Sequence, residues 1–308
     1  MKPGWRKLGC LFTPAAEGRH EKLLTHAANP LPVHLRGDLY RVFYSARDSQ
    51  QRSSVGAVDI DIVRREVIEV HHEPCFLHGA EDSFFAAGVS IGNCYEADGV
   101  RYMLFMGWQN PAGEHWRGDI GRLVVGEDLS LRLADEQPFL ASDAIDPISL
   151  SYPWVLPRRG GGFDMWYGST QSWDAGNGEM LHVLQHASSQ QGHAWHRHGL
   201  AVPFELGVAQ AFSRPTVVPA LSGNGLEMWF SYRSGAGETY RIGRACSQDG
   251  QSWCLALEQA GITVSASGWD SEMIEYPYVF DHAGQRYMLY NGNGYGLTGF
   301  GLAVWDEV

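Results

Sequence analysis

The chain has 308 residues, a formal net charge of −12 at pH 7 and five cysteines. This acidic balance argues against a nucleic-acid-binding protein, because a phosphate-binding surface needs clustered lysine and arginine. No stretch is apolar for long enough to span a membrane, and residues 1–10 lack the apolar core of a secretion signal. Since the cysteines form no CxxC pair, we expect a reducing, cytoplasmic location without disulfides.

Five short segments recur along the chain at a nearly constant spacing. Four of these anchors hold a proline after a polar or aromatic pair, and the remaining one has a valine in its place. In chain order they are residues 28–30, 87–89, 151–153, 213–215 and 275–277. Their last positions (30, 89, 153, 215 and 277) lie 59, 64, 62 and 62 residues apart. A fixed period of this size is typical of a chain built from repeated supersecondary units.

Each anchor is followed by the same two predicted strands. An aromatic-rich strand comes first, at residues 41–44, 102–105, 165–167, 228–230 and 287–290. A strand with small residues follows, at residues 55–58, 119–123, 182–185, 240–243 and 299–302. Two of these run into Ser-x-x-Gly-x-x-Trp turns, at residues 189–195 and 247–253. The pattern predicts an all-β, five-bladed β-propeller that forms a single domain over residues 1–308. A β-sandwich with accidental spacing is the alternative.

In a propeller the first strand of each blade lines the central channel, so the anchors should face one another. The loops after the aromatic strands would surround one mouth of that channel, which is a natural small-molecule site. These loops carry aromatic, amide and guanidinium groups, which suit a polyhydroxylated ligand, although such residues also decorate solvated loops. The candidate ligand-binding residues there are Arg47, Asp48, Tyr232, Arg233, Asn291 and Asn293.

Carboxylates near this rim are few, and glycoside hydrolysis needs two of them. Glu275 is the first candidate, because it belongs to an anchor where the other anchors have serine or alanine. The alternative is a structural ion pair with Arg214 or Arg241. Asp146 is the second candidate, or else an Asx-type turn before Pro147. Asp270 and Glu272 crowd the same entry as Glu275, and Asp270 could equally hold a loop.

The segment 269–278, together with residues 287–294, resembles a bacterial family of five-bladed propeller proteins that is glycosidase-like and often associated with polysaccharide biosynthesis. Segments 45–48, 213–215 and 240–243 also match. More distantly, the chain is similar to arabinanases, β-xylosidases, invertases and mannoside phosphorylases. The resemblance implies acidic residues from three blades at the channel mouth. This sequence departs from that pattern, since residues 25–30 and 83–87 contain no carboxylate and Gln210 stands where a glutamate is expected.

The sequence therefore predicts a carbohydrate-active enzyme, a glycoside hydrolase or a related glycosyl-transferring enzyme. Glu275 and Asp146 would be its acid/base pair, with Asp270 as a further carboxylate. Arg47, Arg214, Arg233 and Arg241 would hold hydroxyls or an anionic group, and His26 would act as a base or be a buried structural histidine. The alternative is a propeller without hydrolase activity that binds a sugar or nucleotide-sugar or catalyses a different reaction.

The expected partner is a small-molecule or oligosaccharide substrate, and the oligomeric state stays open. We expect no cofactor and no metal. The histidines at 193, 196 and 198 have a spacing that could hold a metal ion, but their hairpin is predicted at the outer edge of a blade.

Overall fold

The computed structural model describes residues 3–14, 18–235 and 237–307. Strands make up nearly all of its regular structure. In this described part, helical structure is confined to a 3₁₀ turn, η1 (Leu257–Gln259), and one short helix, α1 (Asn293–Gly296). No helix in these ranges is long and apolar enough to cross a membrane.

Three antiparallel sheets contain four strands each. The first consists of β10 (Ser149–Pro157), β11 (Phe163–Ser172), β12 (Leu181–Ser189) and β13 (His196–Leu200). The second consists of β14 (Ser213–Pro219), β15 (Leu226–Tyr232), β16 (Arg241–Ser247) and β17 (Trp253–Leu255). The third has the order β1-β20-β19-β18, with β18 (Glu275–His282), β19 (Gln285–Asn291), β20 (Phe300–Asp306) and β1 (Gly4–Phe12).

The other eight strands form one larger sheet with two antiparallel units. One unit contains β2 (Thr25–Arg36), β3 (Leu39–Arg47), β4 (Ser53–Asp61) and β5 (Glu66–Phe76). The other contains β6 (Gly88–Ala97), β7 (Val100–Gln109), β8 (Arg117–Val125) and β9 (Leu131–Leu133). A single parallel bridge, Ser53 to Gly88, joins the two units. The predicted aromatic and small-residue strands overlap β3, β4, β7, β8, β11, β12, β15, β16, β19 and β20.

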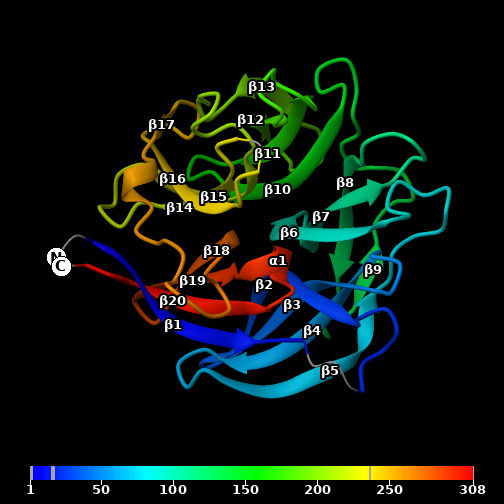
Figure 1. Cartoon of the computed structure of the whole chain (residues 1–308), viewed down its shortest axis with the longest axis vertical. Coiled ribbons are helices and arrows are strands. Elements are labelled where there is room, and N and C mark those ends of the chain that lie inside the picture. Colours follow the sequence, from blue (N-terminus) through cyan, green and yellow to red (C-terminus); the bar gives the residue numbers. More distant parts are fainter. Residues whose placement is uncertain (1–2, 15–17, 236, 308) are drawn as a thin grey trace.

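The first strands of the units form a ring. β2 contacts β6, β6 contacts β10, β10 contacts β14, β14 contacts β18, and β18 returns to β2. Figure 1 shows these five strands gathered around the centre of the molecule, with the later strands of each unit further out. The approach is close, since a Cβ on Gly92 of β6 would lie 2.6 Å from the Pro153 carbonyl oxygen of β10. Only glycine fits at that position.

The two ends of the chain meet in one sheet. β1 pairs antiparallel with β20, with Trp5 opposite Trp305 and their rings 5.1 Å apart. The rings of Trp5 and Trp229 lie 5.4 Å apart, which links this sheet to its neighbour. β1 was not predicted from the sequence, because it precedes the first anchor and belongs to no repeat.

The hydrophobic core lies between neighbouring units. Five buried clusters fill these spaces, and each draws its aromatic and aliphatic side chains from two adjacent units. Tyr278 on β18 packs against three of the clusters, which places it where the units converge. Burial of aromatic side chains on this scale stabilises the interfaces between units.

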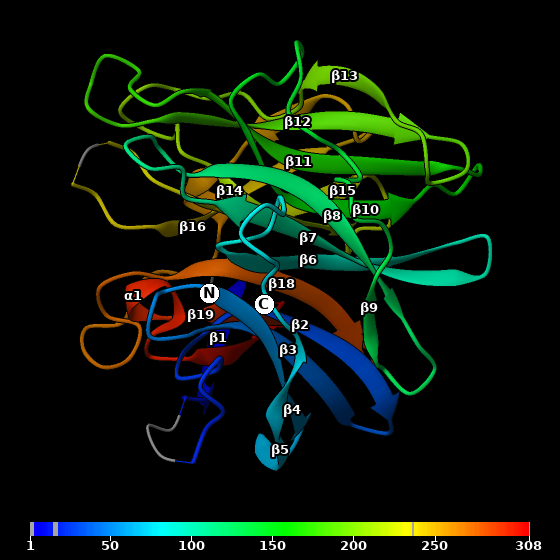
Figure 2. The same cartoon turned by 90° about the vertical axis from the view of Figure 1, so that its right-hand side faces the viewer.

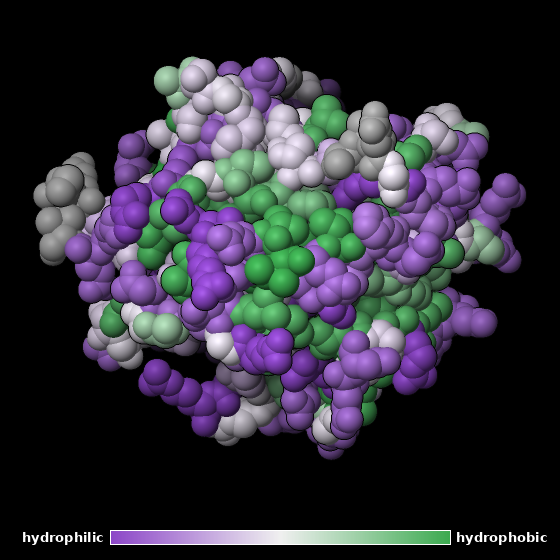
Figure 3. Space-filling view, turned by 90° about the horizontal axis from the view of Figure 1, so that it is seen from below, coloured by the Kyte–Doolittle hydropathy of each residue, from purple (hydrophilic) through white to green (hydrophobic). Residues whose placement is uncertain are grey.

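The outer edge of the molecule is less regular. β5 lies at the lower edge of Figure 1, and Val67 and Ile68 on it are 40% and 54% exposed. Figure 3, which looks onto the molecule from this side, shows apolar side chains gathered among polar ones. Figure 2 shows that α1 and the start of β16 lie at the same end of the strands.

Candidate functional site

The anchor segments share an unusual backbone. In four of them the residue before the proline has a left-handed conformation, with φ of 55° at Asn29, 33° at Tyr152, 46° at Arg214 and 52° at Tyr276. The strand register shifts at each of these positions, which makes them β-bulges. In β6 the shift comes later, between Ile91 and Cys94. A bulge bends the strand and changes where its side chains point.

These bulges surround one cavity of about 500 Å³. Four anchor segments contribute to its lining, and Ser90 does so directly after the fifth. The loops after β7 and β11, Arg233 next to β15 and Tyr295 in α1 are also part of the wall. The lining residues used below are Arg47, Trp108, His115, Trp116, Ser151, Trp173, Glu179, His182, Ser213, Arg233, Tyr240, Tyr276 and Tyr295. The cavity therefore lies where the ring of first strands opens.

Glu275 is a buried carboxyl group beside this cavity. It is 0% exposed, and neither of its carboxyl oxygens has a hydrogen-bond partner. Burial raises its pKa well above the ordinary value of 4.5, while the positive charges of Arg47 and Arg233 act in the opposite direction. Both arginines and the next residue, Tyr276, line the cavity, so Glu275 lies close to the cavity without belonging to its lining. The structure contains no ion pair between Glu275 and either Arg214 or Arg241 within its described ranges.

Glu179 is a second carboxylate of the cavity, and sequence reasoning missed it. It lies in the loop between β11 and β12, is 6% exposed and accepts a hydrogen bond from Arg233 at 2.8 Å. Both Glu179 and Glu275 influence the pKa of Tyr295, so both lie near that tyrosine. The loop between the second and third strands of a unit is where the sequence predicts the ligand-binding residues, and Glu179 lies in that loop of its unit.

Aromatic rings form one side of the cavity. His115 and Trp173 stack with ring centroids 4.6 Å apart, and Trp116 meets Trp173 edge-on at 4.9 Å. These three residues come from the loops after β7 and β11, and Trp108 from the end of β7. A half-buried aromatic surface of this kind suits the apolar face of a sugar ring.

A neutral hydrogen-bonded group forms part of the floor. Ser151 Oγ lies 2.6 Å from His182 Nε2, and His182 Nδ1 lies 2.7 Å from Thr170 Oγ1. Burial lowers the pKa of His182 to about 3, so the imidazole is neutral at pH 7. Gly168 makes room for this contact, because a Cβ there would lie 2.2 Å from the Ser151 hydroxyl. Ser213 occupies the position equivalent to Ser151 in the next unit.

Of the four predicted arginines, the structure brings two to the cavity. Arg47 and Arg233 line it, whereas Arg241 and Tyr232 line a separate surface groove. Arg214 is 2% exposed and donates to the backbone carbonyls of Tyr276 at 2.6 Å and Pro30 at 2.8 Å. It therefore ties β14 to β18 and β2 through its two terminal nitrogens, while its Nε has no hydrogen-bond partner.

Asp146 and Asp270 do not line the cavity. Asp146 is fully buried and accepts hydrogen bonds from Tyr167, Ser169 and Arg197 at 2.6–3.0 Å. Asp270 accepts from Lys7 at 2.7 Å and from Tyr290 at 3.0 Å. Each carboxylate bonds strands of its own unit, and neither forms a cavity pair with Glu275.

The other predicted ligand-binding residues have structural contacts. Asp48 bonds Arg52 and Lys22. Asn291 accepts from the backbone of Asn29 and donates to two carbonyls, and Asn293 accepts from the amide of Glu272. His26 lies behind the wall near Arg47, where burial and that cation lower its pKa to about 4. None of these side chains lines the cavity within the described ranges, whereas Ala28 and Asn29, two and three residues after His26, do.

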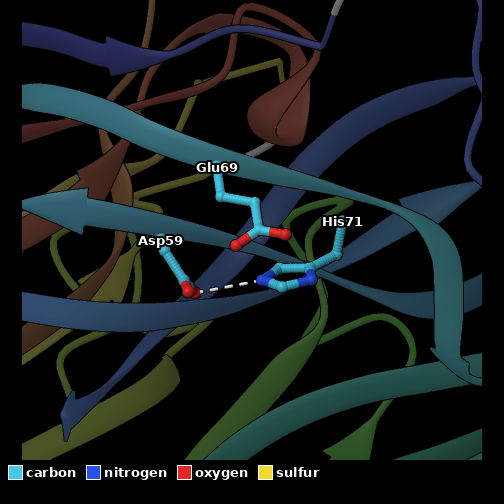
Figure 4. Close-up of side chains that lie close together, drawn as sticks. All are labelled: Asp59, Glu69 and His71. Carbon is cyan, nitrogen blue, oxygen red and sulfur yellow. Dashed lines mark hydrogen bonds and ion pairs between the residues drawn. The ribbon is translucent and has the colours of Figure 1, made fainter.

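One group of side chains has the spacing of a metal site, but one of its two carboxylates is already bound by an arginine. Asp59, Glu69 and His71 lie close together on β4 and β5, far out in their unit (Figure 4). Arg41 donates to both oxygens of Asp59 at 2.8 and 2.9 Å, and His71 Nε2 lies 3.1 Å away. A metal ion bound there would be repelled by the positive charge of Arg41. The predicted hairpin histidine His193 pairs with Asp98 instead of joining a cluster.

Comparison with known proteins gives relatives of the same length. The chain is 41% identical over 305 residues to the uncharacterized proteins MT1551 and Rv1502 of two Mycobacterium tuberculosis strains, CDC 1551 / Oshkosh and ATCC 25618 / H37Rv. The aligned region covers 98% of this chain and 99% of each relative. No model of a protein family matches the chain.

The fold is shared with solved glycoside hydrolases. A glycosyl hydrolase from Bacteroides ovatus superposes with a TM-score of 0.70 at 10% identity, over 99% of this chain and 94% of that one. A structure from the GH130 family of mannoside phosphorylases, which contains glycoside hydrolases that target β-1,2 mannosidic linkages in Candida mannan, gives 0.71 at 11%, over 99% and 94%. The endo-arabinase from Bacteroides thetaiotaomicron gives 0.60 at 13%, over 94% and 98%. The resemblance predicted from the sequence is confirmed for the fold.

Proposed function

Since this chain belongs to the family of the Mycobacterium tuberculosis proteins MT1551 and Rv1502 and has the fold of glycoside hydrolases, we propose that it is a carbohydrate-active enzyme that hydrolyses or transfers glycosides in the central cavity. Its substrate would be a small glycoside or an oligosaccharide. The observation that carries this proposal is Glu275, a fully buried carboxyl group without hydrogen-bond partners beside a cavity that holds a second carboxylate.

Glu275 would be the general acid. Its environment favours the protonated form, which is the form that can donate to the departing glycosidic oxygen. Glu179, which bonds Arg233, would take the other role of such a reaction, either as the base that activates water or as the nucleophile. Two carboxyl groups in contrasting environments are the usual way in which one site holds an acid and a base at neutral pH. Glu179 thus replaces Asp146 in the proposed pair.

The architecture proposed with this function is a single five-bladed propeller domain. The ring of β2, β6, β10, β14 and β18 and the five interfacial clusters support it, if the eight-stranded sheet is counted as two blades joined by the bridge at Ser53. A reducing compartment is proposed for the protein on a separate ground, because all five of its cysteines are free thiols.

The proposal is tested with a panel of aryl glycosides and oligosaccharides that differ in sugar and linkage. The wild-type protein is compared with Glu275→Gln and Glu179→Gln. Glu272→Gln is the matched control, because that side chain is near Glu275 in sequence but outside the cavity. We expect turnover by the wild type and the control, and a loss of about a hundredfold or more in each of the other two variants.

A non-hydrolytic function is the second candidate. The positions equivalent to Glu275 in three other anchors hold Ala28, Ser151 and Ser213. The site therefore contains fewer acids than the resemblance implies, and a site with this lining could bind a sugar without cleaving it. Binding of the same glycosides without turnover by the wild-type protein would support this second candidate and contradict the first.

A further inference from the structure

The side chains that line the cavity carry one more positive charge than negative charge. Its charged lining side chains are Arg47, Arg233 and Glu179. Arg233 and Glu179 form an ion pair at 2.8 Å and balance each other. Other titratable groups close to Arg47 include His26, which is neutral at pH 7, Tyr295 and the buried Glu275.

Arg47 has few partners for a half-buried arginine at a cavity wall. Its side chain donates one hydrogen bond, to Gln51 Oε1 at 3.4 Å. Within the described ranges, no carboxylate oxygen lies within 4.0 Å of its guanidinium nitrogens. By contrast, Arg41, Arg197 and Arg286 each bond at least one carboxylate at 3.0 Å or less. The adjacent carboxylate, Asp48, bonds Arg52 and Lys22 instead of Arg47.

A half-buried cation without a partner is costly, because it loses part of its hydration and gains no ion pair. Arg47 is half-buried at the cavity wall, and its guanidinium group can offer paired N–H donors to a carboxylate or phosphate. The chain as a whole has a charge of −12, which repels anions at long range. A local positive charge is what would hold an anion in such a protein.

We propose that the ligand of this cavity is a sugar that carries an anionic group, a carboxylate or a phosphate, and that Arg47 binds this group. The sugar ring would stack on the aromatic side formed by Trp116 and Trp173, and its hydroxyls would meet Ser151 and Tyr276. This inference rests on the proposed function for the sugar, and on the charge balance at Arg47 for the anion.

The test measures binding by titration calorimetry at low salt. The carboxylate probes are D-glucuronate and D-galacturonate, the phosphate probes are glucose 1-phosphate and UDP-glucose, and the neutral parents are D-glucose and D-galactose. At least one anionic probe should bind the wild type roughly ten- to a hundredfold more tightly than its neutral parent, which is the range of a charge-assisted hydrogen bond. Whether the carboxylate or the phosphate probes show this advantage identifies the source of the charge.

In Arg47→Met the anionic probe should bind no better than its parent, and in Arg47→Lys it should keep part of the advantage. Arg241→Met is the control, because this arginine lies outside the cavity and should leave the preference unchanged. The inference is overturned if no anionic probe outbinds its parent, or if Arg47→Met keeps the preference. Turnover of neutral glycosides by a protein that fails this test would leave the proposed function intact. Arg47-dependent anion binding without any turnover would support the inference about the anion and contradict the proposed catalytic function.

Discussion

The Arg214 guanidinium donates to the backbone carbonyl of Tyr276 at 2.6 Å, although the two residues lie in different sheets. A second nitrogen of the same group donates to Pro30 on β2. Burial lowers the pKa of Arg214 to about 10, which still leaves it charged at pH 7. One buried side chain therefore connects three of the five first strands beneath the cavity.

We expect Arg214→Met to lower the free energy of unfolding by about 3 kcal/mol, since it leaves two buried carbonyl groups without donors. Arg6→Met is the control, because Arg6 forms an exposed ion pair with Asp306. Thermal unfolding of both variants checks this. Equal melting temperatures for the two would contradict the role given to Arg214.

The buried His182 makes the protein sensitive to acid. Its pKa is about 3 in the folded state, against 6.5 when solvated, so between these values the unfolded chain binds more protons. Unfolding free energy should therefore fall as the pH drops below 6.5, by about 1.4 kcal/mol per pH unit for this group. His26, with a pKa of about 4, adds to the same trend. Denaturant unfolding of the wild type and His182→Gln between pH 4 and 7 should show the shallower slope in the variant.

Glu275 should affect stability in the opposite direction. Because its pKa is raised in the folded state, the unfolded chain releases this proton at lower pH than the folded protein does. The wild type should then lose stability relative to Glu275→Gln as the pH rises above 4.5, the ordinary value for the carboxyl group. Melting temperatures of the two proteins at pH 5 and pH 8 measure this. The wild-type value minus the variant value should fall with increasing pH, and an increase in this difference would contradict the burial of an uncharged carboxyl group.

Asp146 should behave as a structural residue. Asp146→Asn removes the charge that Arg197 bonds at 3.0 Å, and breaking such a buried pair costs about 3 kcal/mol. Turnover per folded molecule should stay within about threefold of the wild type, because a stability effect alone does not alter the chemistry of the site. A stable Asp146→Asn protein that has lost turnover would return this residue to the catalytic pair.

Much of the fold could be predicted because the repeat is local. The aromatic strands around Phe43 or Trp229 and the turns at Ser189 and Ser247 depend on short-range pattern and turn chemistry, and the structure has them where expected. Glu275 was singled out because its anchor differs from the others. The ring of repeats predicts that the two chain ends lie close together, as the pairing of β1 with β20 shows, but β1 itself was not predicted as a strand because it precedes the first anchor.

The direction of side chains could not be predicted in the same way. Arg214 belongs to an anchor and Asp146 lies close to one in sequence, but a bulge decides whether such a side chain faces the cavity or the interior. Glu179 lies in a loop of glycine and polar residues, where sequence alone does not show that Arg233 from the next unit will meet it. These contacts depend on how neighbouring units dock, which the repeat period does not specify.

The most direct test of the account compares leaving groups. Wild type and Glu275→Gln are assayed on two glycosides of the same sugar, one with a 2,4-dinitrophenyl leaving group, which needs no protonation, and one with a poor alkyl leaving group, which does. A general acid at Glu275 predicts a loss of about a hundredfold or more on the alkyl glycoside and a far smaller loss on the activated one. Equal losses on both substrates would contradict the role of Glu275 as the proton donor.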